Sequence, residues 1–393
     1  MASPPLSRVP SLLRRPRPGS GDFSWERDDF SPGNRLTLYA EGEGLYAAMA
    51  EAIEDARQTV HLETYIFGDD RTGRTFAELL VRKARSGARV RLIYDAIGSL
   101  DLDPALVTRL RNAGVQILEY HPVAPWRPRW SWNTRDHRKI LVCDGRVGFA
   151  GGMNLCDEHL AAEDGGGGWR DVHARVEGPA AYDLDRLFRE VWFKETGRWF
   201  ESVGDPRLRP GAAPVRVAAN QELLRRLVIR EAYVNALRAA RREVSIANSY
   251  FMPDWRIRRA LAGAARRGVR VRVLVPGRLD SEPVLHAMRE TYGSLLSRGV
   301  RLFEWQGPML HAKAVVVDRL WCAIGSYNLD HRSLRHNLEA NLHVLDADFA
   351  GQLSALFDRG LAGARELTLT DWRRRPWSGR LLEQFWASFE YFF

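Results

Sequence analysis

The chain has 393 residues, of which 45% are hydrophobic and 10% aromatic, so it can bury a large core as two domains or one duplicated fold and is not a disordered protein. Basic residues exceed acidic ones by 58 − 49 = 9, and most of them are arginines. This excess favours anionic partners, either phospholipid head groups or nucleic acid phosphates, and charge alone does not separate the two classes.

Strands and helices alternate in the first half of the sequence. Apolar stretches predict the strands, and amphipathic stretches that end at Gly87 and Gly114 predict two of the helices. The predicted order is strand Asn34–Tyr39, helix Glu43–Arg57, strand Val60–Phe67, helix Asp70–Ser86, strand Val90–Tyr94, helix Pro104–Ala113 and strand Val115–Tyr120. Such alternation predicts an α/β layer fold with a largely parallel sheet.

The second half repeats this order. The phrase Lys83–Ile93 is matched by Ala265–Leu274, which indicates an internal duplication. The predicted elements are helix Ile229–Arg242, strand Val244–Asn248, helix Trp255–Arg267, strand Val269–Val275, helix Val284–Arg298 and strand Val300–Trp305.

The duplication suggests where the domains begin and end. An Arg- and Pro-containing stretch between the halves is typical of a surface linker. The expected division is a flexible basic N-terminus (1–33), a first domain (34–203), a linker (204–217), a second domain (218–365) and a basic and aromatic C-terminal tail (366–393).

Each half carries the same long motif after its last predicted strand. The offsets from His to Lys, Asp and Asn are identical in the two copies: His137, Lys139, Asp144 and Asn154 in the first, and His311, Lys313, Asp318 and Asn328 in the second. Alternation along a strand directs the His and Lys to one face, and the glycines ahead of each Asn predict a turn that comes close to a ligand. Together these donors suit a phosphoryl group.

The chemistry of this set needs no metal. Cleavage of a phosphodiester requires a nucleophile, an acid for the leaving oxygen and positive charge around the phosphoryl oxygens, and two histidines with two lysines supply all three. We therefore expect no cofactor. The cysteines show no metal-binding spacing, and Cys143 and Cys322 lie in apolar stretches that predict small buried hydrophobes.

The two stretches resemble the paired HKD motifs of the phospholipase D superfamily, H-x-K-x4-D-x6-G-[GS]-x-N. The phrases around them are similar to those of bacterial cardiolipin synthases of the short type that lacks membrane-spanning helices: Glu63–Phe67, Asn133–Lys139, Gly151–Asn154, Ser249–Asp254 and Gly325–Ser333. The resemblance implies two phospholipase D-like α/β/α sandwich halves, fused by duplication, with the active site at their interface.

The resemblance also implies roles for the histidines. In the family one His attacks phosphorus to give a phosphohistidine, and the other protonates the departing alcohol. We expect His137 to be the nucleophile with Asp171 behind it, and His311 to be the acid and base with Glu339 behind it. The assignment of the two roles is less firmly based than the set of residues.

The remaining motif residues are assigned in the same way. Lys139 and Lys313 would surround the phosphoryl oxygens, and the motif asparagines, Asn154 and Asn328, would contact the phosphate. The motif aspartates, Asp144 and Asp318, belong to the catalytic motif, but each follows a strand at a turn. A structural role that holds the loop is therefore favoured over contact with substrate.

The implied activity is phosphatidyl transfer, which makes cardiolipin from phosphatidylglycerol and a second phospholipid, with phosphatidylethanolamine as another candidate. The sequence shows no signal peptide and no apolar window of about 18 residues, so a peripheral location on the cytoplasmic side of the cell membrane is expected. The alternatives are a phosphodiesterase that hydrolyses lipid or nucleic acid, and a non-catalytic binder of anionic surfaces, DNA included. Intact His and Lys in both copies disfavour the binder, and nucleic acid is not the expected partner.

Two further stretches are candidates for contact with substrate or membrane. The segment Pro122–Trp132 mixes Trp, Pro and Arg just ahead of the first motif, which suits a lid or a substrate-access loop as well as a plain insertion. Near the C-terminus, Trp372–Trp377 is basic and Leu381–Phe393 is rich in aromatic residues. This tail suits an interfacial amphipathic segment, and the alternative is a terminal helix docked on the core.

Overall fold

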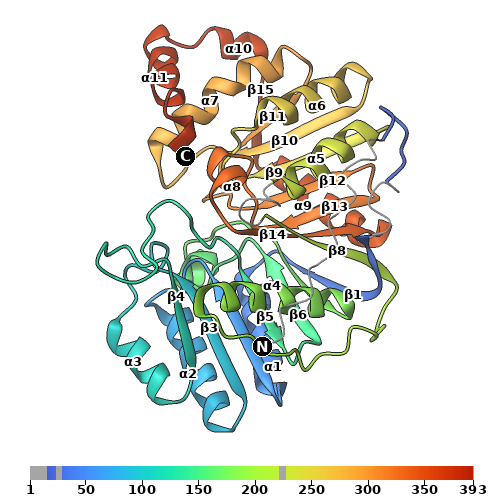
Figure 1. The fold of residues 1–393 in the computed structure, drawn as a ribbon. Helices are drawn as coiled ribbons and strands as arrows, with labels where there is room; N and C mark the ends of the chain where they lie inside the picture. The colour runs from blue at the N-terminus through green and yellow to red at the C-terminus, as the bar shows by residue number, and fades with distance from the viewer. Residues whose placement is uncertain (1–15, 24–28, 221–226, 393) are drawn as a thin grey trace.

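The computed structural model of the chain describes residues 16–23, 29–220 and 227–392. Its strands form one 15-stranded sheet in the order β15-β11-β10-β9-β12-β13-β14-β8-β1-β7-β6-β5-β2-β3-β4. Figure 1 shows the two halves of the chain one above the other, with β8 and β1 between them. The predicted duplicated α/β fold is therefore confirmed, and the sheet runs through both halves.

The first half follows the predicted order closely. The boundaries differ by a few residues at most, because the strongly periodic stretches form the elements that their period indicates. The elements are β1 Ser31–Tyr39, α1 Gly42–Asp55, β2 Thr59–Thr64, α2 Arg71–Arg85, β3 Arg89–Asp95, α3 Pro104–Asn112, β4 Gln116–Tyr120, β5 Ile140–Cys143, β6 Val147–Gly151, β7 His173–Glu177 and α4 Pro179–Thr196.

The second half repeats the first and adds a C-terminal segment. The elements are β8 Ala213–Asn220, α5 Val228–Ala239, β9 Glu243–Asn248, α6 Trp255–Arg266, β10 Arg270–Pro276, α7 Glu282–Leu296, β11 Arg301–Trp305, β12 Lys313–Val317, β13 Trp321–Gly325, α8 His331–Arg335, β14 Glu339–Leu345, α9 Ala347–Ala362, β15 Ala364–Leu367, α10 Leu369–Arg373 and α11 Trp377–Ala387.

Several helices begin directly after a residue whose side chain caps them. Asp70, Asp254, Asp330 and Asp346 each precede a helix, and the side chain of each accepts a hydrogen bond from a backbone N–H in the first turn. Such a cap satisfies one of the unpaired donors of a helix start and contributes about 1 kcal/mol. The short helix α8, next to the second motif, depends on this kind of support because five residues are too few for a stable helix alone.

The expected largely parallel sheet is wrong in part. Only β2-β3-β4 and β9-β10-β11 pair in parallel among the described strands, and the other pairings are antiparallel. Each motif strand is antiparallel to both of its neighbours: β5 lies between β2 and β6, and β12 between β9 and β13. The predicted alternation of strands and helices applies only to the parallel strands. The motif strands that follow them in the chain form antiparallel hairpins.

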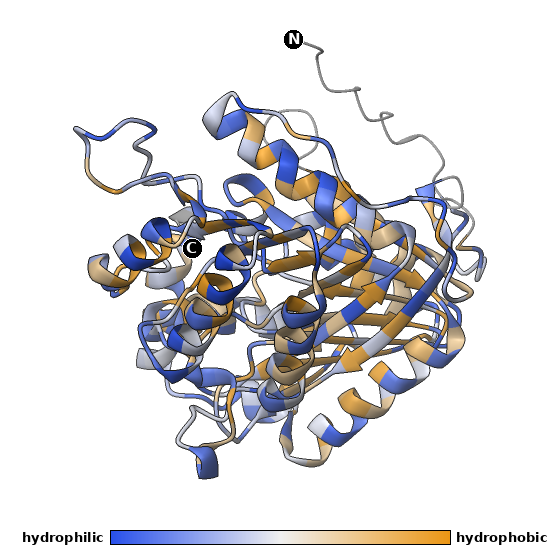
Figure 2. Ribbon diagram, turned by 90° about the horizontal axis from the view of Figure 1, so that it is seen from below, coloured by the Kyte–Doolittle hydropathy of each residue, from blue (hydrophilic) through white to orange (hydrophobic). Residues whose placement is uncertain are grey.

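Helices cover both faces of the sheet, and the buried apolar residues lie between the layers. One core lies against α1, α2 and α3, and another against α5, α6 and α7. On the opposite face, α4 and α9 share a core to which both halves contribute. Figure 2 shows this layering, with largely hydrophobic strands inside and helices of mixed hydropathy outside.

The expected linker and N-terminus are more ordered than predicted where they are described. Residues 213–217, placed in the linker, begin β8, which pairs with β14 along its length. In the N-terminal region, the amide of Gly19 binds the carbonyl of Arg238, and Phe23 is buried in the core of the second half. Residues 1–15 and 24–28 lie outside the described part of the chain.

The C-terminal tail packs as helices. Trp372 of α10 is buried against Tyr292 of α7, and Arg375 forms an ion pair with Glu383 of α11. The outer side of α11 exposes several large apolar residues. Within residues 16–23, 29–220 and 227–392, no helix combines the length and the apolar character needed to cross a bilayer.

Candidate active site

A pocket of about 500 Å³ lies between the halves, and it brings the two motif histidines together. His137 and His311 both line it, as do the motif asparagines, Asn154 and Asn328. The rest of the wall carries aromatic, cationic and acidic groups, among them Tyr65, Trp132, Trp169, Tyr250, Arg135, Arg332, Asp280 and Asp330. One concave surface thus holds residues that are far apart in the sequence.

Each motif histidine is fixed by a short backbone bridge to the other half. The backbone N–H of His137 donates to the carbonyl of Leu338 at 3.0 Å, and that of His311 donates to the carbonyl of Arg170 at 2.7 Å. These contacts belong to the bridges Asp136↔Leu338 and Arg170↔Leu310. The residue after Leu338 is Glu339, and the residue after Arg170 is Asp171.

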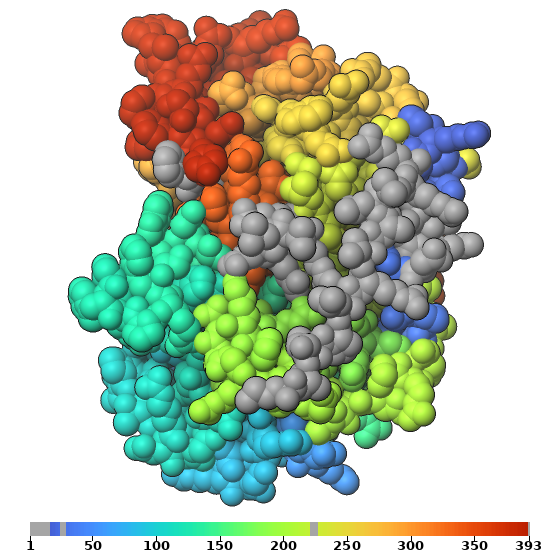
Figure 3. All heavy atoms as spheres, viewed as in Figure 1, coloured from blue at the N-terminus to red at the C-terminus, as the bar shows by residue number. Residues whose placement is uncertain are grey.

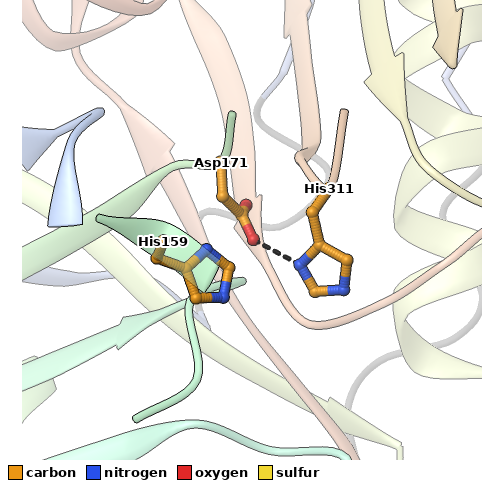
Figure 4. Close-up of side chains that lie close together, drawn as sticks. All are labelled: His159, Asp171 and His311. Carbon is orange, nitrogen blue, oxygen red and sulfur yellow. Dashed lines mark hydrogen bonds and ion pairs between the residues drawn. The ribbon is translucent and has the colours of Figure 1, made fainter. Parts of the chain in front are cut away.

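The carboxylates therefore support the histidines crosswise. Nδ1 of His137 lies 3.1 Å from both carboxylate oxygens of Glu339, and Nδ1 of His311 lies 2.6 Å from Oδ2 of Asp171. Figure 4 shows the Asp171–His311 contact. The expected pairing within each half, His137 with Asp171 and His311 with Glu339, is wrong, because the backbone bridges place each carboxylate beside the histidine of the other half.

The crossed contacts leave the Nε2 atoms as the reactive positions. In a neutral imidazole, a proton on Nδ1 that binds a carboxylate leaves a lone pair on Nε2. Burial and the nearby ammonium of Lys139 lower the pKa of His137 to about 4. Burial and both lysines also lower the pKa of His311. Both rings are therefore neutral near pH 7 in the free protein, and a bound phosphate anion would favour protonation of one of them.

The two lysines are buried beside the histidines. Nζ of Lys139 donates to the backbone carbonyl of His137 at 2.6 Å, and Nζ of Lys313 donates to the carbonyl of His311. Burial lowers the pKa of Lys139 to about 7 and that of Lys313 to about 8, although Glu339 and Asp171 oppose the shift. A bound phosphate anion would favour the ammonium form of both lysines, so the pair forms a strong anion site.

The carboxylates behind the histidines differ in their electrostatics. Burial would raise the pKa of Glu339, but His137, Lys139 and the hydroxyl of Ser326 together lower it. Burial raises the pKa of Asp171 against the opposing charge of Lys313. Glu339 is therefore the carboxylate that holds its negative charge more firmly.

The motif asparagines are placed to present their amide nitrogens to the pocket. Oδ1 of Asn154 accepts from the backbone N–H of Ile66 at 3.2 Å, and Oδ1 of Asn328 accepts from the hydroxyl of Ser249 at 2.9 Å. With the oxygens occupied, the amide N–H groups remain as donors. This arrangement fits the expected contact with phosphate.

The motif aspartates lie at the other end of their strands, away from the histidines. The carboxylate of Asp144 accepts from the backbone N–H groups of residues 57, 58 and 59, and that of Asp318 accepts from those of residues 241, 242 and 243. Both have positive φ, 52° and 54°. This geometry does not support a catalytic role for Asp144 and Asp318. It agrees with the alternative, in which each aspartate holds the loop at the end of its strand.

Sequence reasoning missed three aromatic residues around the histidines. The ring of Tyr65 lies 5.0 Å from that of His137, and Trp169 and His159 lie 5.2 and 5.6 Å from His311. Tyr65 lies inside Glu63–Phe67, a phrase used for the family resemblance, and Trp169 lies two residues before Asp171. His159 had no signal except its place five residues after Asn154.

His159 also belongs to a donor cluster. Its Nε2 accepts from the backbone N–H of Asn154 at 3.1 Å, whereas its buried Nδ1 has no hydrogen-bond partner among the described residues. Figure 4 shows it beside Asp171 and His311, and their ligand atoms lie within 4.8 Å of one another. Two imidazoles and a carboxylate are a donor set that Zn²⁺ accepts. A metal there would displace the Asp171–His311 hydrogen bond.

Comparison with protein families matches residues 49–192 and 233–361 to the family described as "Cardiolipin synthase, PLD-like domain". Similar proteins include the cardiolipin synthase of Geobacillus thermodenitrificans, 34% identical over 90% of this chain and 71% of that protein. Another is cardiolipin synthase A of Pseudomonas putida, 37% identical over 86% of this chain and 71% of that protein.

A solved structure, the phosphatidylserine synthase of Haemophilus influenzae, superposes with a TM-score of 0.68 at 12% identity, over 91% of this chain and 94% of that one. At this identity the superposition concerns the fold alone. It supports the same arrangement of two α/β halves.

The crossed support can be tested with Glu339→Gln. The amide keeps the shape but cannot stabilise a positive imidazole, so we expect kcat to fall by about 10²–10⁴-fold with little loss of folded protein. In the free protein, the ¹⁵N resonances of His137 should shift and those of His311 should not. Asp171→Asn, the corresponding change at the other carboxylate, should shift the resonances of His311 and leave those of His137 in place. A shift at His311 in Glu339→Gln would contradict the crossed arrangement.

The structural role of the motif aspartates predicts a separation of stability from activity. Asp318→Ala removes three hydrogen bonds to a buried carboxylate, so the free energy of unfolding should fall by about 2–3 kcal/mol. Below the melting transition, kcat should stay within about twofold of the unmodified protein. Denaturant unfolding and a rate assay on the same sample measure both, with the exposed Glu290→Ala as control. A large loss of kcat in folded Asp318→Ala would restore the catalytic assignment.

Proposed function

The chain belongs to the phospholipase D-like family of cardiolipin synthases, and from this we propose that it transfers a phosphatidyl group from phosphatidylglycerol to a second phospholipid. The observation that carries the proposal is the pair of crossed histidine–carboxylate contacts at one pocket, with two buried lysines beside them. Phosphatidylglycerol is the proposed acceptor as well as the donor, and phosphatidylethanolamine is an alternative acceptor.

In the first step, Nε2 of His137 attacks phosphorus, and the bond from phosphorus to the head-group glycerol oxygen breaks. Protonated Nε2 of His311 gives its proton to that oxygen, so glycerol leaves and a phosphatidyl-histidine remains. Glu339 suits the support of the nucleophile, because its lowered pKa keeps a negative charge beside an imidazole that becomes positive.

In the second step, neutral His311 takes the proton from the head-group hydroxyl of the second lipid. The alkoxide attacks phosphorus, the phosphorus–nitrogen bond breaks, and cardiolipin is released with His137 restored. Lys139 and Lys313 stabilise the charge on the phosphoryl oxygens in both steps. With water in place of the lipid hydroxyl, the same residues would give phosphatidic acid, which is the competing hydrolytic function.

Purified protein mixed with phosphatidylglycerol vesicles should produce cardiolipin and glycerol in equal amounts, because one glycerol leaves for each transfer. His137→Ala and His311→Ala should each lower the rate by at least about 10³-fold, since each histidine makes or breaks a bond. Mass spectrometry of the lipids and an enzymatic glycerol assay measure the products. Phosphatidic acid as the sole product would assign hydrolysis, and full activity in both variants would exclude this site.

We also propose that the protein meets the membrane with one edge, on the cytoplasmic face. Large apolar side chains are exposed there in two segments, the insertion at 122–132 and the C-terminal segment at 377–391. Figure 3 shows both on the same side of the molecule, the insertion in turquoise and the C-terminal segment in red. These residues are Trp126, Trp130, Trp132, Trp377, Leu381, Leu382, Phe385, Phe389 and Tyr391.

Contacts join this edge to the active site. Nδ2 of Asn133, next to the insertion, lies 3.1 Å from Nδ1 of His336, and the ring of His336 lies 5.7 Å from that of Tyr391. Trp132 of the insertion and Arg332 of α8 both line the catalytic pocket. Aromatic residues at a bilayer interface, with exposed arginines such as Arg373 and Arg374 beside them, suit an anionic lipid surface.

The double change Trp126→Ala and Phe385→Ala should lower partitioning onto phosphatidylglycerol vesicles at least about tenfold, because burial of each side chain contributes roughly 1.5–3 kcal/mol. Sedimentation with vesicles measures it. The double variant should still turn over a short-chain lipid that is dissolved as monomers. Trp255→Ala, at an exposed tryptophan of α6, is the matched control. Equal partitioning of the double variant and the control would contradict this membrane edge.

A further inference from the structure

The two halves differ beside their motif histidines, on the face of the sheet that α4 and α9 cover. In the first half, three charged residues fill this position. Arg138 is fully buried, lies 3.7 Å from Glu63, and donates to the carbonyls of Asn220 and Glu339 at 3.3 and 3.4 Å. Asp136 is buried beside them. Charged side chains therefore occupy the space behind His137.

The strand registers identify the equivalent residues in the second half. The motif offset places Leu310 at the position of Asp136 and Ala312 at that of Arg138. Glu63 pairs with Ile140, as Ala247 pairs with Ala314, so Ala247 takes the position of Glu63. Each charged residue of the first half is thus replaced by an apolar one, and the two alanines, Ala312 and Ala247, are much smaller than Arg138 and Glu63.

The space that these replacements vacate is a slot under α9. Its walls include Ala247, Leu310, Ala312 and Ala314 from the strands and Leu353, Leu356 and Phe357 from α9, and its narrow interior measures about 60 Å³. Apart from Ser245 the inner wall is apolar, so it offers a water molecule few partners. The interior suits the terminal methylenes of a chain.

The mouth of the slot is positively charged. Arg170 lines it, with its guanidinium 4.6 Å from the ring centre of Trp305. Burial and the nearby guanidinium of Arg359 lower the pKa of Arg170, and Glu41 opposes them. Within the described part of the chain, no carboxylate lies within ion-pair distance of Arg170. A positive group at the opening of an apolar slot suits a ligand with an anionic head and an apolar chain.

We propose that this slot is a binding site for a long-chain fatty acid, separate from the catalytic pocket, with the carboxylate at Arg170 and the chain end against Ala312 and Ala314. A bound chain would lie against Leu310, the neighbour of His311. The backbone bridge between Arg170 and Leu310 lies between the slot and the catalytic pocket, and Asp171, which supports His311, also lines the slot. Binding of a fatty acid in the slot therefore does not depend on a substrate phosphate in the catalytic pocket.

Calorimetric titration of the full chain with dodecanoate, below the concentration at which it forms micelles, tests the proposal. One saturable site is expected. Ala314→Ile, which copies Ile140 of the first half, should weaken binding at least about tenfold by filling the slot, and Arg170→Gln should weaken it about tenfold by removing the charge. Dodecanol should bind more weakly than dodecanoate and should not respond to Arg170→Gln.

Two matched variants separate the slot from other sites. Arg111→Gln, at an exposed arginine of α3, and Trp132→Ala, at the catalytic pocket, should bind dodecanoate as the unmodified protein does. Melting temperatures of all variants confirm that they are folded, and Arg170→Gln remains informative if Ala314→Ile does not fold. Absence of saturable binding, equal binding by folded Ala314→Ile, or loss of binding in Trp132→Ala would each overturn the proposal.

Discussion

The active site depends on two hydrogen-bonded contacts, each of which joins a histidine of one half to a carboxylate of the other. Each motif histidine is oriented by a carboxylate of the other half, at 3.1 Å for Glu339 and 2.6 Å for Asp171. The backbone bridges beside these contacts fix the same geometry from the main chain. Any relative movement of the halves would disturb both histidines together. The continuous sheet and the core shared by α4 and α9 oppose such a movement.

Burial of two lysines and two imidazoles in one place is costly for stability and useful for catalysis. The protein lacks enough negative charge around them to offset their burial, as the lowered pKa values of Lys139, Lys313 and both histidines show. A phosphodiester supplies the missing charge when it binds. Binding energy and transition-state stabilisation therefore come from the same preorganised cations.

Much of this was predictable from the sequence, for identifiable reasons. Doubled offsets at His137 and His311 gave the site, and strong periodicity gave most helices and strands within a few residues. The pairing of Glu339 with His137 and of Asp171 with His311 was not predictable, because sequence proximity favours contacts within a half. The bridges at Leu338 and Arg170, which the structure shows, place the carboxylates crosswise. The antiparallel hairpins of β5 and β12 were also missed, since short buried strands carry no direction in their composition.

The strand order has a consequence for the origin of the chain. Apart from β15, which has no counterpart beyond β4, the sheet passes through equivalent strands from either end and meets itself at the β1–β8 pair, so the halves are related by an approximate two-fold axis. A single half could form the crossed histidine–carboxylate contacts only by associating with a second copy of itself. Fusion into one chain makes that association independent of concentration. Fusion also allows each half to mutate independently. Equivalent positions of the two halves can then hold different residues, as Arg138 and Ala312 do.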